Sequence, residues 1–137
     1  MTVTLNHTII HASDKTASAK FYTSLLGLAS HKNLGPFAVV QVGDTSLDFI
    51  ETDEEITSRH FAFQVSEAEF DDIFGRIQAL ELPIWADPFK KHPGEINHWD
   101  DGRGVYFPDP DGHLLEILTR PYGSGGLEAE HVNPLLR

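Results

Sequence analysis

The chain has 137 residues, no cysteine and a formal net charge of −11, a length typical of one domain. The absence of cysteine excludes disulfides, thiolate metal ligands and a cysteine nucleophile, and the negative charge disfavours nucleic acid and anionic membranes as partners, because like charges repel. No apolar run approaches the roughly 20 residues that cross a bilayer, and the N-terminus lacks a signal-peptide pattern, so a cytoplasmic protein is expected.

The first half of the chain predicts a strand, a helix and three further strands. The opening strand is expected over residues 3–11. Ser13 or Asp14 can cap a helix over 15–26, which Gly27 can terminate. Three extended stretches follow, separated by glycine-containing turns: 28–34, 37–42 and 46–51.

The second half of the chain repeats this plan. A strand over 59–65 runs into a capping box formed by Ser66 and Glu69, which opens a helix over 67–80. The remaining expected segments are an extended stretch over 83–87 and a long polar loop over 88–103. Two strands follow, over 104–107 and 113–119, with a turn over 109–112 between them. Such a long loop is typical of a lid or a specificity element.

The two halves can be superposed at both ends. Placing His7 on His60 aligns the helix starts, and placing Asp48 on Glu116 aligns the last strands. The superposition predicts one domain over residues 1–122, built from modules 1–56 and 57–122. The tail, 123–137, is rich in glycine and lacks periodicity, so it is either disordered or docks its leucines on a neighbour.

Four residues that can bind a metal occupy matched positions in the two modules. His7, Asp48, His60 and Glu116 each lie on the strand face opposite the helix. A carboxylate within an apolar strand is costly unless a charge meets it, and a divalent metal is a suitable partner. Two histidines and one carboxylate can bind Fe(II), Mn, Ni or Zn with positions left open. Each residue also has a simpler reading, as an exposed histidine or as an edge charge that opposes aggregation.

Three stretches of the sequence resemble one known family. "LNHTIIHASDKTASAKFYTSLLGL", "HFAFQVSEAEFDDIF" and "GVYFPDPDGHLLEI" resemble the vicinal oxygen chelate superfamily, also called the glyoxalase, bleomycin resistance protein and dioxygenase family. The resemblance implies an α+β fold in which paired βαβββ modules form a cup-shaped sheet around a metal. It implies metal ligands at His7, His60 and Glu116, and a fourth at Asp48, where a longer glutamate is usual. Glu116 and Tyr106 are the expected catalytic residues, with Tyr106 either pointing into the cup or packing at its rim.

The resemblance implies a metal-dependent enzyme that chelates adjacent oxygens of a small oxygen-rich molecule. Dioxygenase-like chemistry with Fe(II) is slightly favoured, whereas metal binding by Asp48 would favour a glyoxalase-like lyase or isomerase. A homodimer with shared sites is expected. Fosfomycin transferases are less expected, because they need a cationic pocket and this chain is acidic. The alternative is a metal-free protein that sequesters a drug or natural product, as bleomycin resistance proteins do.

Overall fold

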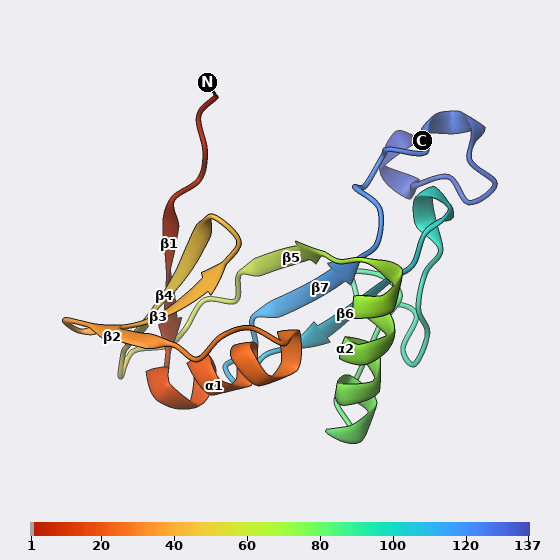
Figure 1. Cartoon of the computed structure of the whole chain (residues 1–137). Helices are drawn as coiled ribbons and strands as arrows, with labels where there is room; N and C mark the ends of the chain where they lie inside the picture. The colour runs from red at the N-terminus through yellow and green to blue at the C-terminus, as the bar shows by residue number, and fades with distance from the viewer. Residues whose placement is uncertain (1) are drawn as a thin grey trace. The chain divides into compact units, whose positions relative to one another are not determined.

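The computed structural model describes residues 2–137, which divide into two compact units (Figure 1). The first unit ends at Thr57 and the second runs from Ser58 to Arg137. Each unit combines one α-helix with one β-sheet, which confirms the predicted α+β class. No helix among the described residues is long and apolar enough to cross a membrane.

The first unit contains a four-stranded sheet with one helix. Its elements are β1 (His7–Ala12), α1 (Lys15–Leu26), β2 (Lys32–Leu34), β3 (Phe37–Val42) and β4 (Thr45–Glu51). The strand order is β1-β4-β3-β2, with β1 parallel to β4 and the other pairs antiparallel. The prediction that the first strand begins at residue 3 was wrong. His7 pairs with Ser46 near the start of β4, so the preceding residues have little partner strand to extend along.

Helix α1 begins and ends as its sequence predicts. The Asp14 carboxylate accepts a hydrogen bond from the Ala17 amide, and Gly27 takes a left-handed conformation with φ 71° after the last turn. The ring of Tyr22 lies 4.8 Å from that of Phe49 on β4, and both side chains are fully buried. The helix therefore covers one face of the sheet and leaves the other face to the residues of alternate parity.

The second unit contains a three-stranded sheet of order β5-β7-β6. Its main elements are β5 (His60–Gln64), α2 (Glu67–Ala79), β6 (Gly104–Pro108) and β7 (Leu114–Leu118). Three 3₁₀ turns complete the unit: η1 (Trp99–Asp101), η2 (Gly126–Glu128) and η3 (Pro134–Leu136). Both hydrogen bonds of the capping box predicted at Ser66 and Glu69 are present.

The extended stretch predicted over 83–87 forms no full strand. Only Trp85 makes isolated bridges, to Tyr106 of β6 and to Pro93. The chain turns away directly afterwards, because the Asp87 carboxylate accepts hydrogen bonds from the Lys91 and His92 amides at 2.9 and 2.8 Å. The second module therefore has the element order β-α-β-β in the described residues. The prediction of a fourth strand was wrong, because only the bridges at Trp85 form there.

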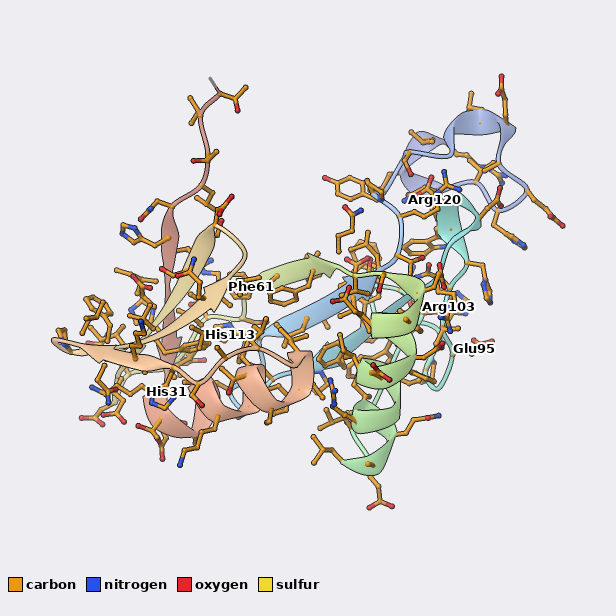
Figure 2. The ribbon with its side chains drawn as sticks, in the orientation of Figure 1. His31, Phe61, Glu95, Arg103, His113 and Arg120 are labelled. Carbon is orange, nitrogen blue, oxygen red and sulfur yellow. The ribbon has the colours of Figure 1, made fainter. Side chains whose placement is uncertain are left out.

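A buried contact of His113 and a partly exposed contact of Arg103 support the second sheet. His113 is buried after the turn between β6 and β7, where its Nδ1 accepts a hydrogen bond from the Arg59 amide and its ring meets the edge of Phe61 (Figure 2). Arg103, just before β6, lies beside α2, donates to Glu67 and Asp71 at 2.8 Å and covers the ring of Phe70 (Figure 2). The sequence interpretation of His113 as a structural residue agrees with these contacts.

The C-terminal segment, defined here as residues 121–137, packs on its own unit. It lies beside η1 (Figure 1), where the Asp100 and Asp101 carboxylates accept hydrogen bonds from its backbone amides. The segment is therefore ordered on its own unit rather than disordered, while docking of its exposed leucines on a neighbour stays a prediction. The anchors are backbone amides, which carry no pattern in the sequence.

Candidate metal centre

His60 and Glu116 are brought together by the parallel pairing of β5 with β7. His60 pairs with Leu114 and Ala62 with Glu116, so the two polar side chains lie on one face of the sheet. His60 Nε2 lies 3.2 Å from Glu116 Oε1. The Glu116 residue is only 6% exposed, whereas the His60 side chain is 44% exposed, so the carboxylate is held beneath the imidazole.

The other nitrogen of His60 determines what this pair can hold. His60 Nδ1 lies 2.9 Å from the Leu114 carbonyl oxygen, which can only accept, so Nδ1 carries a proton. In neutral imidazole the Nε2 lone pair then faces the carboxylate, an arrangement that needs a cation or a proton between them. The hydrogen bond with Glu116 correspondingly raises the pKa of His60, against the opposing effect of burial.

The geometry of the pair fits a metal ion. Histidines that bind metals commonly donate their second N–H to a backbone carbonyl, as His60 does to Leu114. Two donors about 2.1 Å from one ion, at a right angle to each other, lie about 3 Å apart. The separation of 3.2 Å between His60 Nε2 and Glu116 Oε1 matches this edge of a coordination shell.

Tyr106 lies on the third strand of the same face. It pairs with Glu116 across β6 and β7, and its ring stacks on His60 with centroids 5.7 Å apart. Burial, followed by the charge of Glu116 and a hydrogen bond to it, raises the pKa of Tyr106 well above its ordinary value. The hydroxyl therefore remains protonated at neutral pH and serves as a hydrogen-bond donor.

A cavity of about 250 Å³ opens beside these three residues. Its other walls come from the loop over 88–103 and from the C-terminal segment. They are formed by Pro88, Trp99, Tyr122, Asn133 and Leu135. The cavity is mostly aromatic and aliphatic, with the polar groups of His60, Glu116 and Tyr106 gathered at one place, as in many small-molecule sites.

The first unit presents the equivalent pair, His7 and Asp48, in a different environment. His7 pairs with Ser46, and Asp48 follows two positions further along β4, which repeats the register of His60 and Glu116. His7 is exposed, and its Nδ1 lies 2.7 Å from the Asn6 side-chain oxygen. Asp48 is half-buried and accepts a hydrogen bond from the Ser46 hydroxyl at 2.8 Å.

The structure thus groups the predicted site residues by unit. His60, Glu116 and Tyr106 meet in the second unit, while His7 and Asp48 share a face of the first. Within either unit, the described residues contain no group of three or more histidine, aspartate or glutamate side chains that could hold a metal.

The cavity also contains residues that sequence reasoning missed. Tyr122, Asn133 and Leu135 belong to the C-terminal segment, whose composition predicts no site. Asn133 offered the one available signal, since a polar residue followed by proline is typical of a turn. Trp99 of the long loop and Tyr106, the expected catalytic tyrosine, also line the cavity.

The fold and the paired histidine–carboxylate strands define a class of protein, and comparison with known sequences names it. Residues 4–117 match the Glyoxalase/Bleomycin resistance protein/Dioxygenase superfamily, and the chain belongs to this family. Oxidase ChaP-H1 has a similar solved structure, with a TM-score of 0.87 and 58% identity over 90% of this chain and 100% of that chain.

Two further relatives are named as transferases. Glutathione transferase FosA of Serratia marcescens is 32% identical over 85% of this chain and 81% of its own length. Metallothiol transferase FosB of Lysinibacillus sphaericus is 29% identical over 87% of this chain and 84% of its own length. These names confirm the expectation that leans towards an enzyme, and they support a divalent metal as the cofactor class.

Proposed function

We propose that this protein is a metal-dependent oxidase or dioxygenase that acts on a small oxygen-rich molecule in the cavity of the second unit. The observation that carries the proposal is the contact between His60 Nε2 and Glu116 Oε1, with Nδ1 of the same ring committed to the Leu114 carbonyl. A resident divalent ion would act there as a Lewis acid towards adjacent oxygens of the substrate. Fe(II) is the metal we favour, with Ni, Zn and Mn as alternatives.

One comparison and one feature of the cavity favour oxidation over group transfer. The relatives of highest identity cited here, Oxidase ChaP-H1 and Oxidase ChaP-H2, are 58% and 57% identical to this chain. Among the described residues that line the cavity there is no lysine or arginine to hold an anionic substrate such as a phosphonate. A cavity with this lining suits a neutral or weakly polar ligand.

The residues of the cavity have separate proposed roles. Glu116 and Tyr106 face the reacting atoms, with the Tyr106 hydroxyl donating a hydrogen bond to a substrate oxygen. His60 and Glu116 hold the metal. Pro88 and Trp99 pack on the organic part of the substrate and exclude water, which strengthens the polar contacts inside the cavity.

A third metal ligand is proposed from the other module. Catalytic metals commonly have three protein ligands and an open position, and the second unit contributes one histidine and one carboxylate. His7 suits this role, because its Nδ1 faces the Asn6 oxygen and the Nε2 lone pair can then bind the metal. We propose a symmetric homodimer in which His7 of each copy completes the site of the other, with Asp48 as the candidate fourth ligand.

Metal analysis tests this function. The purified chain is stripped, reconstituted anaerobically with Fe(II), Zn, Ni or Mn in turn, and desalted before the bound metal is measured. The unaltered protein is expected to retain about one ion per chain, and His60→Ala to retain almost none. His31→Ala removes a histidine from the loop before β2 and should bind as the unaltered protein does. An unaltered protein without metal would instead favour the drug-sequestering function.

Oxygen uptake tests the reaction class. The Fe(II)-loaded protein is mixed with catechol, which carries adjacent oxygens, and dissolved oxygen is followed with an electrode. Uptake that depends on both Fe(II) and catechol is the expected result. A metal-loaded protein that consumes no oxygen with catechol or a panel of larger phenols would favour a lyase or transferase.

A further inference from the structure

The carboxylate of Asp100 holds the C-terminal segment from inside the protein. Asp100 is 1% exposed, and its oxygens accept hydrogen bonds from the amides of Gly123 at 2.8 Å and Gly125 at 3.0 Å. The side-chain amide of Asn133 donates to the same carboxylate at 3.3 Å. The Asp100 amide also donates to the His131 carbonyl oxygen at 2.7 Å. One buried residue is thus bonded to four positions of the segment.

The backbone on both sides is shaped for this contact. Asp100 has a positive φ of 59°, which points its carboxylate and amide at the segment. Gly125 approaches so closely that an added Cβ would lie 3.0 Å from Asp100 Cα and 2.9 Å from Ala129 Cβ. A larger residue at position 125 would have to displace the segment from Asp100.

The segment that Asp100 holds is also a wall of the cavity. Tyr122, Asn133 and Leu135 line the cavity, and Trp99, adjacent to Asp100 in sequence, lines it from the other side. Leu135 is 75% exposed, so few contacts of its own keep it in this place. The segment begins beyond residue 117, where the match to the family model ends, so the match does not include this wall.

We propose that Asp100 is a positioning residue that ties the C-terminal segment over the cavity as a specificity element for the apolar part of the ligand. The inference rests on the proposed function, in that it takes the cavity beside His60 and Glu116 as the substrate site. The lining of Trp99, Tyr122 and Leu135 selects a neutral ligand with a flat apolar face. Loss of the hydrogen bonds between Asp100 and the C-terminal segment weakens binding of that face of the ligand. The contact between His60 and Glu116 stays unchanged.

The first test uses 1-naphthol, a neutral flat phenol, with the metal-free full-length protein. Binding is followed by quenching of tryptophan fluorescence, since Trp99 lines the cavity and the chain has only 2 tryptophans. Asp100→Asn keeps the size of the side chain, and asparagine tolerates a positive φ, but the variant loses one acceptor oxygen. A weakening of about tenfold or more is expected, because the buried side chain keeps only one of the two oxygens that accept from the part-buried Gly123 and Gly125 amides.

Asp101→Asn is the matched control. Asp101 also has a positive φ, of 60°, and binds the Glu130 and His131 amides, but it is exposed and does not line the cavity. This variant should change 1-naphthol affinity by less than about twofold, in line with the small effect of exposed contacts. Equal losses in the two variants would overturn the assignment to Asp100.

Two further variants keep the proposal testable if Asp100→Asn does not fold. Gly125→Ala displaces the segment without changing the carboxylate, and a chain ending at Arg120 lacks the wall altogether. Both should lose 1-naphthol binding. Unchanged affinity in any folded member of this set, judged by thermal melting, would overturn the proposal, as would a lack of saturable 1-naphthol binding by the unaltered protein.

Metal binding separates this inference from the proposed function. Asp100→Asn should bind metal as the unaltered protein does, whereas a merely structural role would weaken metal and 1-naphthol together. An unaltered protein that holds no metal after reconstitution, but binds 1-naphthol more tightly than Asp100→Asn does, would contradict the metal centre and leave this inference standing. A failure of the metal centre and a failure of the cavity wall therefore give different results.

Discussion

The two units carry a histidine–carboxylate pair in the same strand register, but the two carboxylates lie in different surroundings. In the second unit Glu116 is buried and meets both His60 and Tyr106. In the first unit Asp48 is half-buried and meets the neutral hydroxyl of Ser46. The same pattern of alternate residues on two strands thus gives the two carboxylates different burial and different partners.

The difference arises from what each module adds to the common plan. The second unit has the long loop over 88–103 and the C-terminal segment, and both contribute cavity walls. The first unit connects its strands by short turns, such as the one at Gly43 between β3 and β4. A buried carboxylate needs a charged or hydrogen-bonding partner, and the added segments provide the burial that gives this pair its strength.

Removing each carboxylate in turn should give the largest difference between the two units, which is a difference in metal affinity. Glu116→Ala should lower metal affinity by more than about 100-fold, because changes to groups that only support the ligands already cost 10–100-fold. Asp48→Ala should cost less, since the Ser46 hydroxyl already binds this carboxylate. Isothermal titration with Zn measures both variants. Equal losses of affinity would show that Asp48 contributes as much to metal binding as Glu116 does.

Mixing two inactive variants tests whether the units of different copies complement each other. His7→Ala and Glu116→Ala are unfolded together and co-refolded. In a homodimer with shared sites, random pairing leaves about one site in four intact, so bound metal should recover to roughly a quarter of the unaltered level. Each variant refolded alone serves as the control. Proven mixed dimers that retain no metal would reject shared sites while leaving the His60–Glu116 pair unaffected.

Two glycines sharpen the comparison of packing between the units. A Cβ at Gly104 of β6 would lie 2.9 Å from the side-chain oxygen of buried Asn97, so Gly104→Ala should lower the free energy of unfolding by about 1–3 kcal/mol. Gly43 has open space around it but a φ of +58°, so Gly43→Ala should cost about 1 kcal/mol from backbone strain alone. Urea unfolding measures both. A larger loss at Gly43 would contradict the tighter packing inferred beside β6.

The helix caps give the smallest expected difference between the units. Asp14→Ala removes one capping bond from α1, and Ser66→Ala breaks the reciprocal box with Glu69 at the start of α2. Each should cost about 1 kcal/mol of unfolding free energy, with Ser66→Ala the larger. Ser24→Ala, which removes only an exposed hydroxyl bonded to the Lys20 carbonyl, is the control and should be nearly neutral. A reversed order of the two caps would show that the box adds nothing here.

Local patterns in the sequence were sufficient for the helices and for the faces of the strands. The helix over 15–26 and the capping box at Ser66 follow from residues within one turn of each other. The shared face of His60 and Glu116 follows from the two-residue period of a strand, together with the match between the modules. These features depend on neighbours in sequence, so one chain without relatives was enough to predict them.

Only the tertiary structure decided how the cavity is closed. The bridge at Trp85, the turn around Asp87 and the tie between Asp100 and the C-terminal segment join residues through backbone amides and carbonyls. Every residue except proline offers the same amide donor, so composition and periodicity carry no record of which amide a buried carboxylate will bind. The sequence by itself therefore determined the family, the fold class and the candidate ligands, whereas long-range packing decided which residues form the cavity beside His60 and Glu116.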